Sequence, residues 1–213
     1  MQSLFSLDSP IMRCMSRVAD LVILNLLFLL TSLPILTIGP SLAAMYTVLF
    51  WLGTPKEQGL FRSYFRAFAE NFWQGLVLWL LVVVCIGITG VDIWVLYRLS
   101  SPLRYLYLAA GALLVVFLLA GSYVFPLISQ FRAGNLATLK NALALSIGYL
   151  PRSLAIVALH LLPLGMLLLA PYLFLQIGFL WIFFYFAGVG YLTRLLLKKV
   201  FQPYLPEESE PSQ

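Results

Sequence analysis

The chain has 213 residues, 62% of them hydrophobic and only 10% charged, and its mean hydropathy is +0.97. A soluble domain needs a polar surface, so this composition excludes one and indicates a polytopic membrane protein whose main partner is the lipid bilayer. The net charge of +5 comes from Lys and Arg residues that stand at the ends of apolar runs. Because these residues form no soluble basic face, they indicate membrane topology rather than nucleic-acid binding.

Four uncharged runs are each long enough to cross a bilayer core of roughly 30 Å. They are Leu21–Pro55, Asn71–Val91, Tyr105–Phe131 and Ser153–Thr193. As one helix, the last run would reach roughly 60 Å, so it must fold back. We expect the break at Ala170–Pro171, because proline interrupts a helix.

The first run is interrupted by Pro34, Gly39 and Pro40, so it crosses the membrane either once or twice. One crossing gives five spans and divides the 13 Lys and Arg residues 9 to 4 between the two sides. Two crossings give six spans and an 11 to 2 division, which agrees better with the positive-inside rule. We therefore predict an all-α transmembrane helix bundle of six spans, with five as the alternative and both termini in the cytoplasm. The expected spans are 18–36, 40–53, 72–97, 104–130, 152–170 and 172–194.

The segment between the first two expected spans contains Pro34, Thr37, Gly39 and Pro40. Gly39 gives the backbone access to positive φ and Pro40 removes one donor, so this pair predicts a reversal of the chain. Irregular backbone inside the membrane is tolerated only where neighbouring helices or water satisfy its polar groups. Two interpretations stay open, a kinked helical hairpin and the binding site of a broken helix.

Two amphipathic helices are expected in the cytoplasmic interface. In the first, aromatic residues share one face at helical spacing, namely Phe61, Phe65, Phe68 and Phe72. Its other side carries polar residues, namely Arg62, Ser63, Arg66 and Glu70. The second has a weaker apolar stripe of Leu136, Leu139, Leu143, Ile147 and Leu150. Lys140 lies at the edge of that stripe, Asn141 lies opposite, and Arg152 begins the next span. Each helix either anchors the bundle or docks a cytosolic partner.

The two halves of the chain show a weak similarity to each other. At an offset of 77 residues, "LAAMY" (42–46) aligns with "LAGSY" (119–123). Each word is followed by an amphipathic helix and then by an outward-going span, which suggests an ancient parallel repeat. After the last span, "QPYLPEESEPSQ" has three prolines and three glutamates with almost nothing to bury. We therefore expect one membrane domain over residues 1–201 and a disordered cytoplasmic tail over 202–213.

Few polar residues lie inside the expected spans. His160 is the only histidine, and it either binds a proton or substrate or hydrogen-bonds a neighbouring helix or the carbonyls freed by Pro163. Asn25, Gln74 and Gln176 are expected to join helices through hydrogen bonds. The sequence contains no HExxH, GxSxG or Walker A motif and no pair of intramembrane acids. We therefore expect no catalytic residue, metal site or cofactor, and we predict that the protein is not an enzyme.

The stretch "LNLLFLLTSLPILTIGPSLAAMY" (24–46) resembles the signature of the YesL-like family of bacterial integral membrane proteins. The shared features are Asn25, the Leu33-Pro34 step, the Thr-Ile-Gly-Pro words at 37–40 and the small residues that follow. A later block, "YVFPLISQFRAGNLATLKNALALSIGYLPRSLAIV" (123–157), is also similar to that family, whereas residues 53–120 depart from it freely.

The resemblance implies a location in the bacterial inner membrane and no defined activity, because the family is a domain of unknown function. Its members tend to accompany genes for ATP-driven sugar import and polysaccharide breakdown. Three hypotheses follow. The protein is an accessory or regulatory component of ATP-driven oligosaccharide import that contacts importer subunits. Alternatively, it is an autonomous small-solute transporter or channel whose pathway passes residues 34–40 and His160. The third hypothesis is a purely structural membrane protein.

Overall fold

The computed structural model describes residues 10–54, 59–99 and 102–204, and every regular element within these ranges is a helix. The longer helices are α1 (Pro10–Thr31), α2 (Ile38–Trp51), α3 (Leu60–Glu70), α4 (Phe72–Arg98), α5 (Leu106–Gln130), α6 (Asn135–Gly148), α7 (Leu150–Leu169) and α10 (Phe186–Phe201). The shorter elements are η2 (Ile35–Thr37), η3 (Pro102–Tyr105), α8 (Pro171–Gln176), α9 (Gly178–Leu180), the π-helical segment η4 (Trp181–Tyr185) and η5 (Gln202–Tyr204). The all-α prediction is therefore confirmed for the described residues.

Within those residues, four helical segments are long and apolar enough to cross a membrane. They are Phe72–Arg98, Pro102–Gln130, Leu150–Leu169 and Gly178–Tyr204. The chain is therefore a multi-pass membrane protein, while the count of six spans stays a prediction. The predicted break is confirmed, because α7 ends at Leu169, Ala170 leaves the helical region at φ −144 and ψ 64, and Pro171 begins α8.

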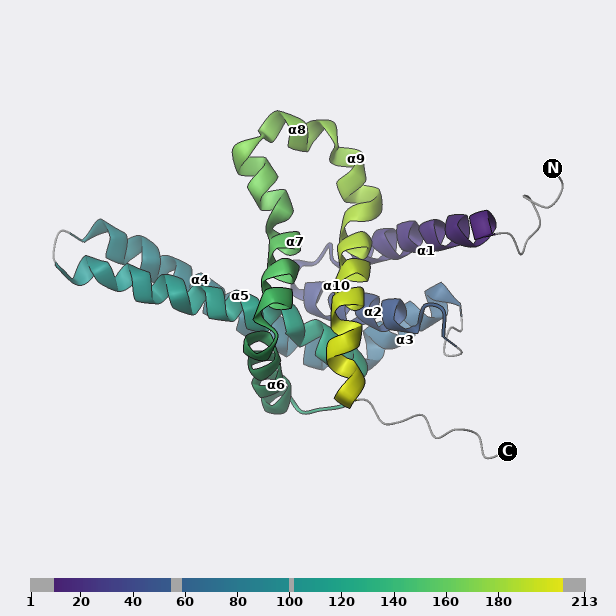
Figure 1. Ribbon diagram of the computed structural model, residues 1–213, viewed down its shortest axis with the longest axis horizontal. Coiled ribbons are helices and arrows are strands. Elements are labelled where there is room, and N and C mark those ends of the chain that lie inside the picture. Colours follow the sequence, from purple (N-terminus) through teal and green to yellow (C-terminus); the bar gives the residue numbers. More distant parts are fainter. Residues whose placement is uncertain (1–9, 55–58, 100–101, 205–213) are drawn as a thin grey trace.

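Three helical hairpins extend from a common centre (Figure 1). The hairpin of α4 and α5 projects to one side, α7 and α10 run across its direction, and α1 and α2 point away from it. The α1–α2 hairpin has its turn at the centre, whereas the other two hairpins have their turns at the periphery. Helices α3 and α6 follow the first and second hairpins and pack beside α2 and α5.

Helix α2 forms the centre of the core. Ten of its 14 residues are buried, and it packs against α1, α3, α4, α5 and α10. A helix that is apolar on all sides is stable only when other helices surround it. Its first turn lies against α4 at Gly75, and near its last turn Phe50 stacks on Phe201, which itself touches Phe131. Both ends of α2 therefore lie near the ends of α4, α5 and α10 that the charge pattern assigns to the cytoplasm, which gives no support to the expected separate crossing by residues 40–53.

The predicted role of Gly39 is wrong. Among the described residues, positive φ occurs only at Gly53 and Gly59, and Gly39 lies in the helical first turn of α2. A Cβ atom at Gly39 would overlap the carbonyl oxygen of Gly75 and lie 2.5 Å from Cβ of Trp79. A Cβ at Gly75 would in turn lie 2.7 Å from the nitrogen of Pro40. Gly39 is therefore required by the close approach of two helices, and the chain reverses earlier, between Thr31 and Thr37.

Candidate functional site

The turn between α1 and α2 is irregular, but three of its backbone carbonyls, those of Thr31, Pro34 and Ile35, have partners. The Thr37 hydroxyl donates to the carbonyl of Thr31 at 2.6 Å or to that of Pro34 at 2.7 Å. The indole N–H of Trp79 on α4 donates to the carbonyl of Ile35 at 2.9 Å. Neighbouring groups therefore meet the requirement for irregular backbone in a membrane. The structure favours a turn held by protein contacts over an open binding site.

Asn25 is completely buried on α1 and binds the π-helical segment of the last span. Its side-chain amide donates to the carbonyl of Ile182 at 2.6 Å, and its oxygen accepts the backbone N–H of Ala187 at 2.8 Å. Residues 182 and 187 are five apart, which is the spacing of a π-helical hydrogen bond. The Asn25 side chain therefore pairs with the carbonyl of Ile182 and the N–H of Ala187, two groups at the π-helical turn. The prediction that Asn25 joins helices is confirmed.

The two glutamines differ. The Gln74 side chain donates to the carbonyl of Ala133 at 2.8 Å and so joins the start of α4 to the segment after α5, as predicted. Gln176 is exposed on α8, and within the described residues its side chain makes no hydrogen bond. The prediction for Gln176 is therefore wrong. The break at Ala170–Pro171 places it on the turn between two spans instead of between helices.

The carbonyl freed by Pro163 is paired by a residue that sequence reasoning missed. Proline has no N–H, so Pro163 leaves the carbonyl of Leu159 without its helical donor. The Tyr185 hydroxyl, in the π-helical segment, donates to this carbonyl at 2.5 Å. Tyr185 thus joins α7 to the last span at the point where each helix is irregular.

His160 pairs with a second residue that the sequence did not single out. Its Nδ1 lies 2.8 Å from the carbonyl of Ile156, and a carbonyl only accepts, so Nδ1 carries the proton. Nε2 is then an acceptor, and the hydroxyl of Tyr46, a fully buried residue of α2, lies 3.4 Å from it. His160 itself is exposed on α7. Of the predicted alternatives, the structure places His160 in a hydrogen bond to a neighbouring helix.

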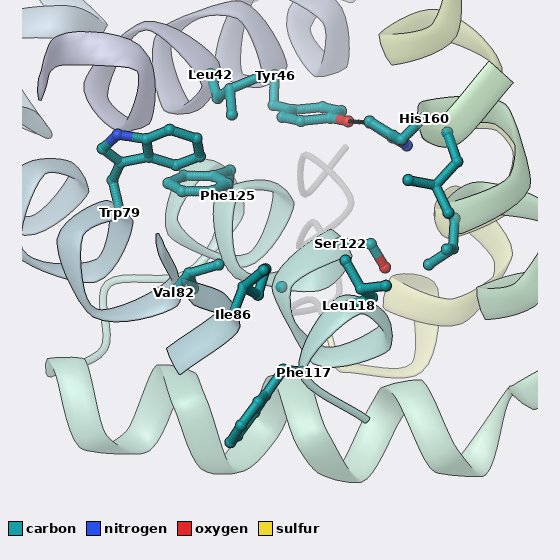
Figure 2. A pocket seen from close by; sticks show the side chains of 13 residues that line it. Leu42, Tyr46, Trp79, Val82, Ile86, Phe117, Leu118, Ser122, Phe125 and His160 are labelled. Atoms are coloured by element: carbon teal, nitrogen blue, oxygen red, sulfur yellow. Dashed lines mark hydrogen bonds between the residues drawn. The ribbon is translucent and has the colours of Figure 1, made fainter. Parts of the chain in front are cut away.

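The Tyr46–His160 pair borders a cavity of about 200 Å³ between α2, α4, α5 and α7 (Figure 2). Figure 2 shows Trp79 and Phe125 along another side, with their ring centroids 6.2 Å apart. Most of the wall is aliphatic or aromatic, and Ser122 supplies the remaining hydroxyl. That hydroxyl donates to the carbonyl of Leu119 at 2.7 Å. Each polar side chain on the wall is therefore already paired with a protein group.

A similar tyrosine contact occurs on α5. Tyr123 is fully buried, and its hydroxyl lies 2.9 Å from the hydroxyl of Ser153 on α7. Ser153 in turn donates to the carbonyl of Ser146 at 2.8 Å, at the end of α6. Tyr46 and Tyr123 are the last residues of the two aligned words, and both bind α7. The repeat stays a hypothesis, but the aligned words were the signal that marks both tyrosines.

Helix α3 presents the first two residues of its predicted aromatic stripe outward. Phe61 and Phe65 are 57% and 48% exposed, whereas the buried face of α3 consists of Ser63, Tyr64 and Ala67. The Tyr64 hydroxyl lies 2.6 Å from that of Thr31. Burial raises the pKa of Tyr64 to about 12, although the hydrogen bonds with Thr31 and Ser41 oppose this shift.

The remaining predicted residues of α3 divide between core and surface. Phe68 packs against the hydrophobic core, so it belongs to the bundle rather than to a free surface. Arg66 lies 3.8 Å from Glu70 and stacks over the ring of Trp51 at 5.1 Å. Arg62 is exposed beside Phe61 and Phe65. Phe61, Arg62 and Phe65 therefore form an outward aromatic and basic surface.

Helix α6 has the same arrangement as α3. It buries small and polar side chains, namely Thr138, Ala142 and Ser146. Most of its predicted apolar stripe is exposed, including Leu136, Leu143, Ile147 and Leu150. Lys140 and Asn141 are exposed as well, and Arg152 stacks over Tyr149 at 5.4 Å. Helix α6 therefore packs on the bundle through small and polar side chains, whereas α3 also buries the large Tyr64, and in both helices part of the apolar stripe is exposed.

Within the described ranges, no group of three or more His, Cys, Asp or Glu side chains is placed to hold a metal ion. No curated protein and no solved structure matches the chain significantly.

Residues 21–93 match the model of a family described as "Protein of unknown function, DUF624". The matched segment runs from Leu21 in α1 to Ile93 in α4, and it includes the Asn25 bridge, the turn at 32–37 and the crossing of Gly39 with Gly75. The YesL-like family is a DUF624 family, so this match agrees with the resemblance, and residues 21–93 are similar to a family of unknown function.

Proposed function

We propose that this protein is an accessory or regulatory subunit of ATP-driven oligosaccharide import in a bacterial inner membrane. It carries out no chemical reaction itself. Both termini and the helices α3 and α6 face the cytoplasm, where an importer's ATPase and the inner loops of its permease are found. Residues 1–201 form the membrane domain, and the proposed disordered tail, 202–213, lies almost entirely outside the described residues.

The outward stripes of α3 and α6 carry this proposal. Each helix packs on the bundle through a face other than its apolar stripe and leaves exposed apolar residues next to basic ones. Phe61 and Phe65 beside exposed Arg62 fit both a lipid interface and an acidic protein surface, and the proposal takes the protein surface. Arginine and aromatic residues are the side chains most enriched at protein interfaces.

The chemistry of the cavity favours an accessory role over transport by this chain alone. A sugar presents many hydroxyl groups and needs polar partners along its path, because unpaired hydroxyls in an apolar site are costly. The cavity bordered by Tyr46 and His160 is mostly apolar, and the Ser122 hydroxyl is already bound to Leu119. Such walls offer a sugar no replacement for its water.

The packing of the helix ends supports the proposed orientation. Phe201 touches Phe50 and Phe131, and Arg194 donates to the carbonyl of Leu52 at 2.9 Å. These contacts gather the ends of α2, α5 and α10 at one side of the bundle, which is the side that the 11 to 2 division assigns to the cytoplasm.

Affinity capture from native membranes in mild detergent tests the proposal. We expect the wild-type protein to retain subunits of an ATP-driven sugar importer, identified by mass spectrometry. The double variant Phe61→Ser with Phe65→Ser should lose them, because both side chains are exposed and contribute to binding more than to folding. Leu103→Ser with Leu106→Ser is the matched control, since these two residues are 61% and 52% exposed at the opposite, predicted outer end.

Two results would contradict the proposal. One is the absence of importer subunits from the wild-type capture when they are present in the same membranes. The other is uptake of an oligosaccharide into vesicles that contain this protein alone, which would favour the autonomous transporter.

A further inference from the structure

We propose that the cavity between α2, α4, α5 and α7 holds a hydrocarbon chain of a membrane phospholipid. The cavity measures about 200 Å³, and its walls are formed mainly by aliphatic and aromatic side chains (Figure 2). The pocket is half-open, and its mostly apolar wall gains little from water and accepts apolar guests. A ligand in this position must therefore supply apolar surface.

The hydrogen bonds of the wall define the ligand further. Tyr46 and His160 are hydrogen-bonded to each other, and the Nδ1–H of His160 donates to the carbonyl of Ile156. The indole N–H of Trp79 and the hydroxyl of Ser122 donate to backbone carbonyls. No polar group on the wall therefore needs a partner from the ligand. The wall therefore offers few polar contacts to a sugar or an amino acid and fits an unsubstituted chain of methylene groups.

The depth of the cavity identifies the source of such a chain. Its lining extends from Trp79 to Ile86 on α4, from Phe117 to Phe125 on α5 and from Val157 to Leu161 on α7. These stretches lie inside helices of membrane length, away from their ends. At that depth a bilayer offers acyl chains and almost no water or headgroup.

A second apolar cavity adjoins the first. It measures about 340 Å³, lies between α4, α5 and α6, and shares Val82, Phe117 and Gly121 with the first cavity. Two neighbouring apolar spaces match a ligand that carries two chains, which is the construction of a phospholipid. The missing side chain at Gly121 keeps the shared wall thin, because a Cβ there would already touch Val82 at 3.4 Å.

Native mass spectrometry of the protein purified in a maltoside detergent tests this inference. We expect the wild type to retain a phospholipid after the lipids on its outer surface have been removed. Gly121→Leu places a branched side chain in the shared wall and should lower lipid occupancy about tenfold. Gly111→Leu is the matched control, because it makes the same change on the same helix where no atom lies within 4 Å. Val157→Phe fills the cavity from α7 and should act like Gly121→Leu.

A photoreactive phosphatidylglycerol with its reactive group at the chain end gives a measurement on the unmodified protein. At an equimolar ratio in detergent, we expect crosslinks to residues 79–86 and 117–125. Crosslinks confined to the outer surface of the bundle would overturn the inference. Purified wild-type protein that carries no lipid would also overturn it. So would an unchanged lipid occupancy in Gly121→Leu or Val157→Phe, provided that the variant unfolds at the wild-type temperature. None of these readouts involves an importer, so this inference and the proposed function can fail separately.

Discussion

Gly39 and Gly75 cross at backbone contact: a Cβ atom on Gly39 would collide with the main chain of Gly75, and one on Gly75 would collide with the main chain of Pro40. The contact joins the first turn of α2 to the first turn of α4, and both residues lie in the segment that matches the DUF624 family. Main-chain atoms cannot move aside as the end of a side chain can, so even one methyl group must push the helices apart.

Alanine at either crossing glycine should destabilise the protein. We expect Gly39→Ala and Gly75→Ala each to lower the free energy of unfolding by about 1–3 kcal/mol, the cost of overpacking a tight core. Gly87→Ala is the control, since no atom lies within 4 Å of its added Cβ and alanine favours the helix by about 0.5–1 kcal/mol. Thermal unfolding in detergent measures all three. Equal stability of Gly39→Ala and Gly87→Ala would show that the helices are not in contact there.

Loss of the Asn25 bridge should loosen the last span. In Asn25→Leu the carbonyl of Ile182 and the N–H of Ala187 lose their partner, at about 1–3 kcal/mol for each buried group. Hydrogen exchange of residues 181–187 should accelerate together with a lower unfolding temperature. Gln176→Leu, which changes an exposed amide on α8, should leave both measurements unchanged. A similar shift in the two variants would remove the special role of Asn25.

Tyr185 and Pro163 should be energetically coupled. Tyr185→Phe removes the donor to the carbonyl of Leu159 and should cost about 1–2 kcal/mol. In Pro163→Ala the restored N–H supplies that carbonyl from within α7, so Tyr185→Phe should cost much less in this background. A double-mutant cycle of unfolding free energies measures the coupling, which we expect to be about 1 kcal/mol. Additive effects would mean that the hydroxyl does not replace the missing helical donor.

The aromatic residues of α3 should differ in their effect on folding. Phe68 packs on the core, so Phe68→Ser should lower stability by roughly 1–3 kcal/mol, less than the 3–5 kcal/mol of a completely buried phenylalanine. Phe61 is 57% exposed, so Phe61→Ser should stay within about 0.5 kcal/mol of the wild type. Circular dichroism during heating separates the two. The reverse order of stabilities would show that the buried face of α3 is assigned incorrectly.

The depth of the first turn can be measured with single cysteines in a Cys14→Ser, Cys85→Ser background. We expect an impermeant maleimide to label Leu103→Cys in intact cells and Asn135→Cys only after permeabilisation. Leu33 is 76% exposed in the turn, but Gly39 and Ile35 lie beside the first turns of α4. We therefore expect Leu33→Cys to resist labelling from outside. Labelling of Leu33→Cys as readily as Leu103→Cys would place this turn at the outer surface.

Features that depend on local sequence could be predicted well. Runs without charge located the long helices, and a proline after a small residue located the break at Ala170–Pro171. Asn25 is a single amide in an apolar helix, and it predicts a hydrogen bond to another helix because an unpaired amide is costly in hydrocarbon.

Features that depend on contacts between distant residues could not be predicted. Gly39 suits both a positive φ and a close crossing, and only the position of Gly75 decides between them. The partner of His160 is 114 residues away on α2, and the aligned words mark Tyr46 without indicating that its hydroxyl reaches α7. Spacing predicts the aromatic stripe of α3, but it does not show that Phe68 packs on the core while Phe61 is exposed. It also does not show that Ser63, Tyr64 and Ala67 form the buried face.

The bond from Trp79 to the carbonyl of Ile35 also has a consequence for the order of assembly during synthesis. The ribosome makes Ile35 more than forty residues before Trp79, and Gly39 well before Gly75. Until α4 has entered the bilayer, the carbonyl of Ile35 lacks its partner and the first turn of α2 has no surface to pack on. An unpaired carbonyl in hydrocarbon costs several kcal/mol, so the finished turn is unstable at that stage. The α1–α2 hairpin therefore reaches its final depth only after α4 has been inserted, and the most buried helix of the protein is positioned by one that is made later.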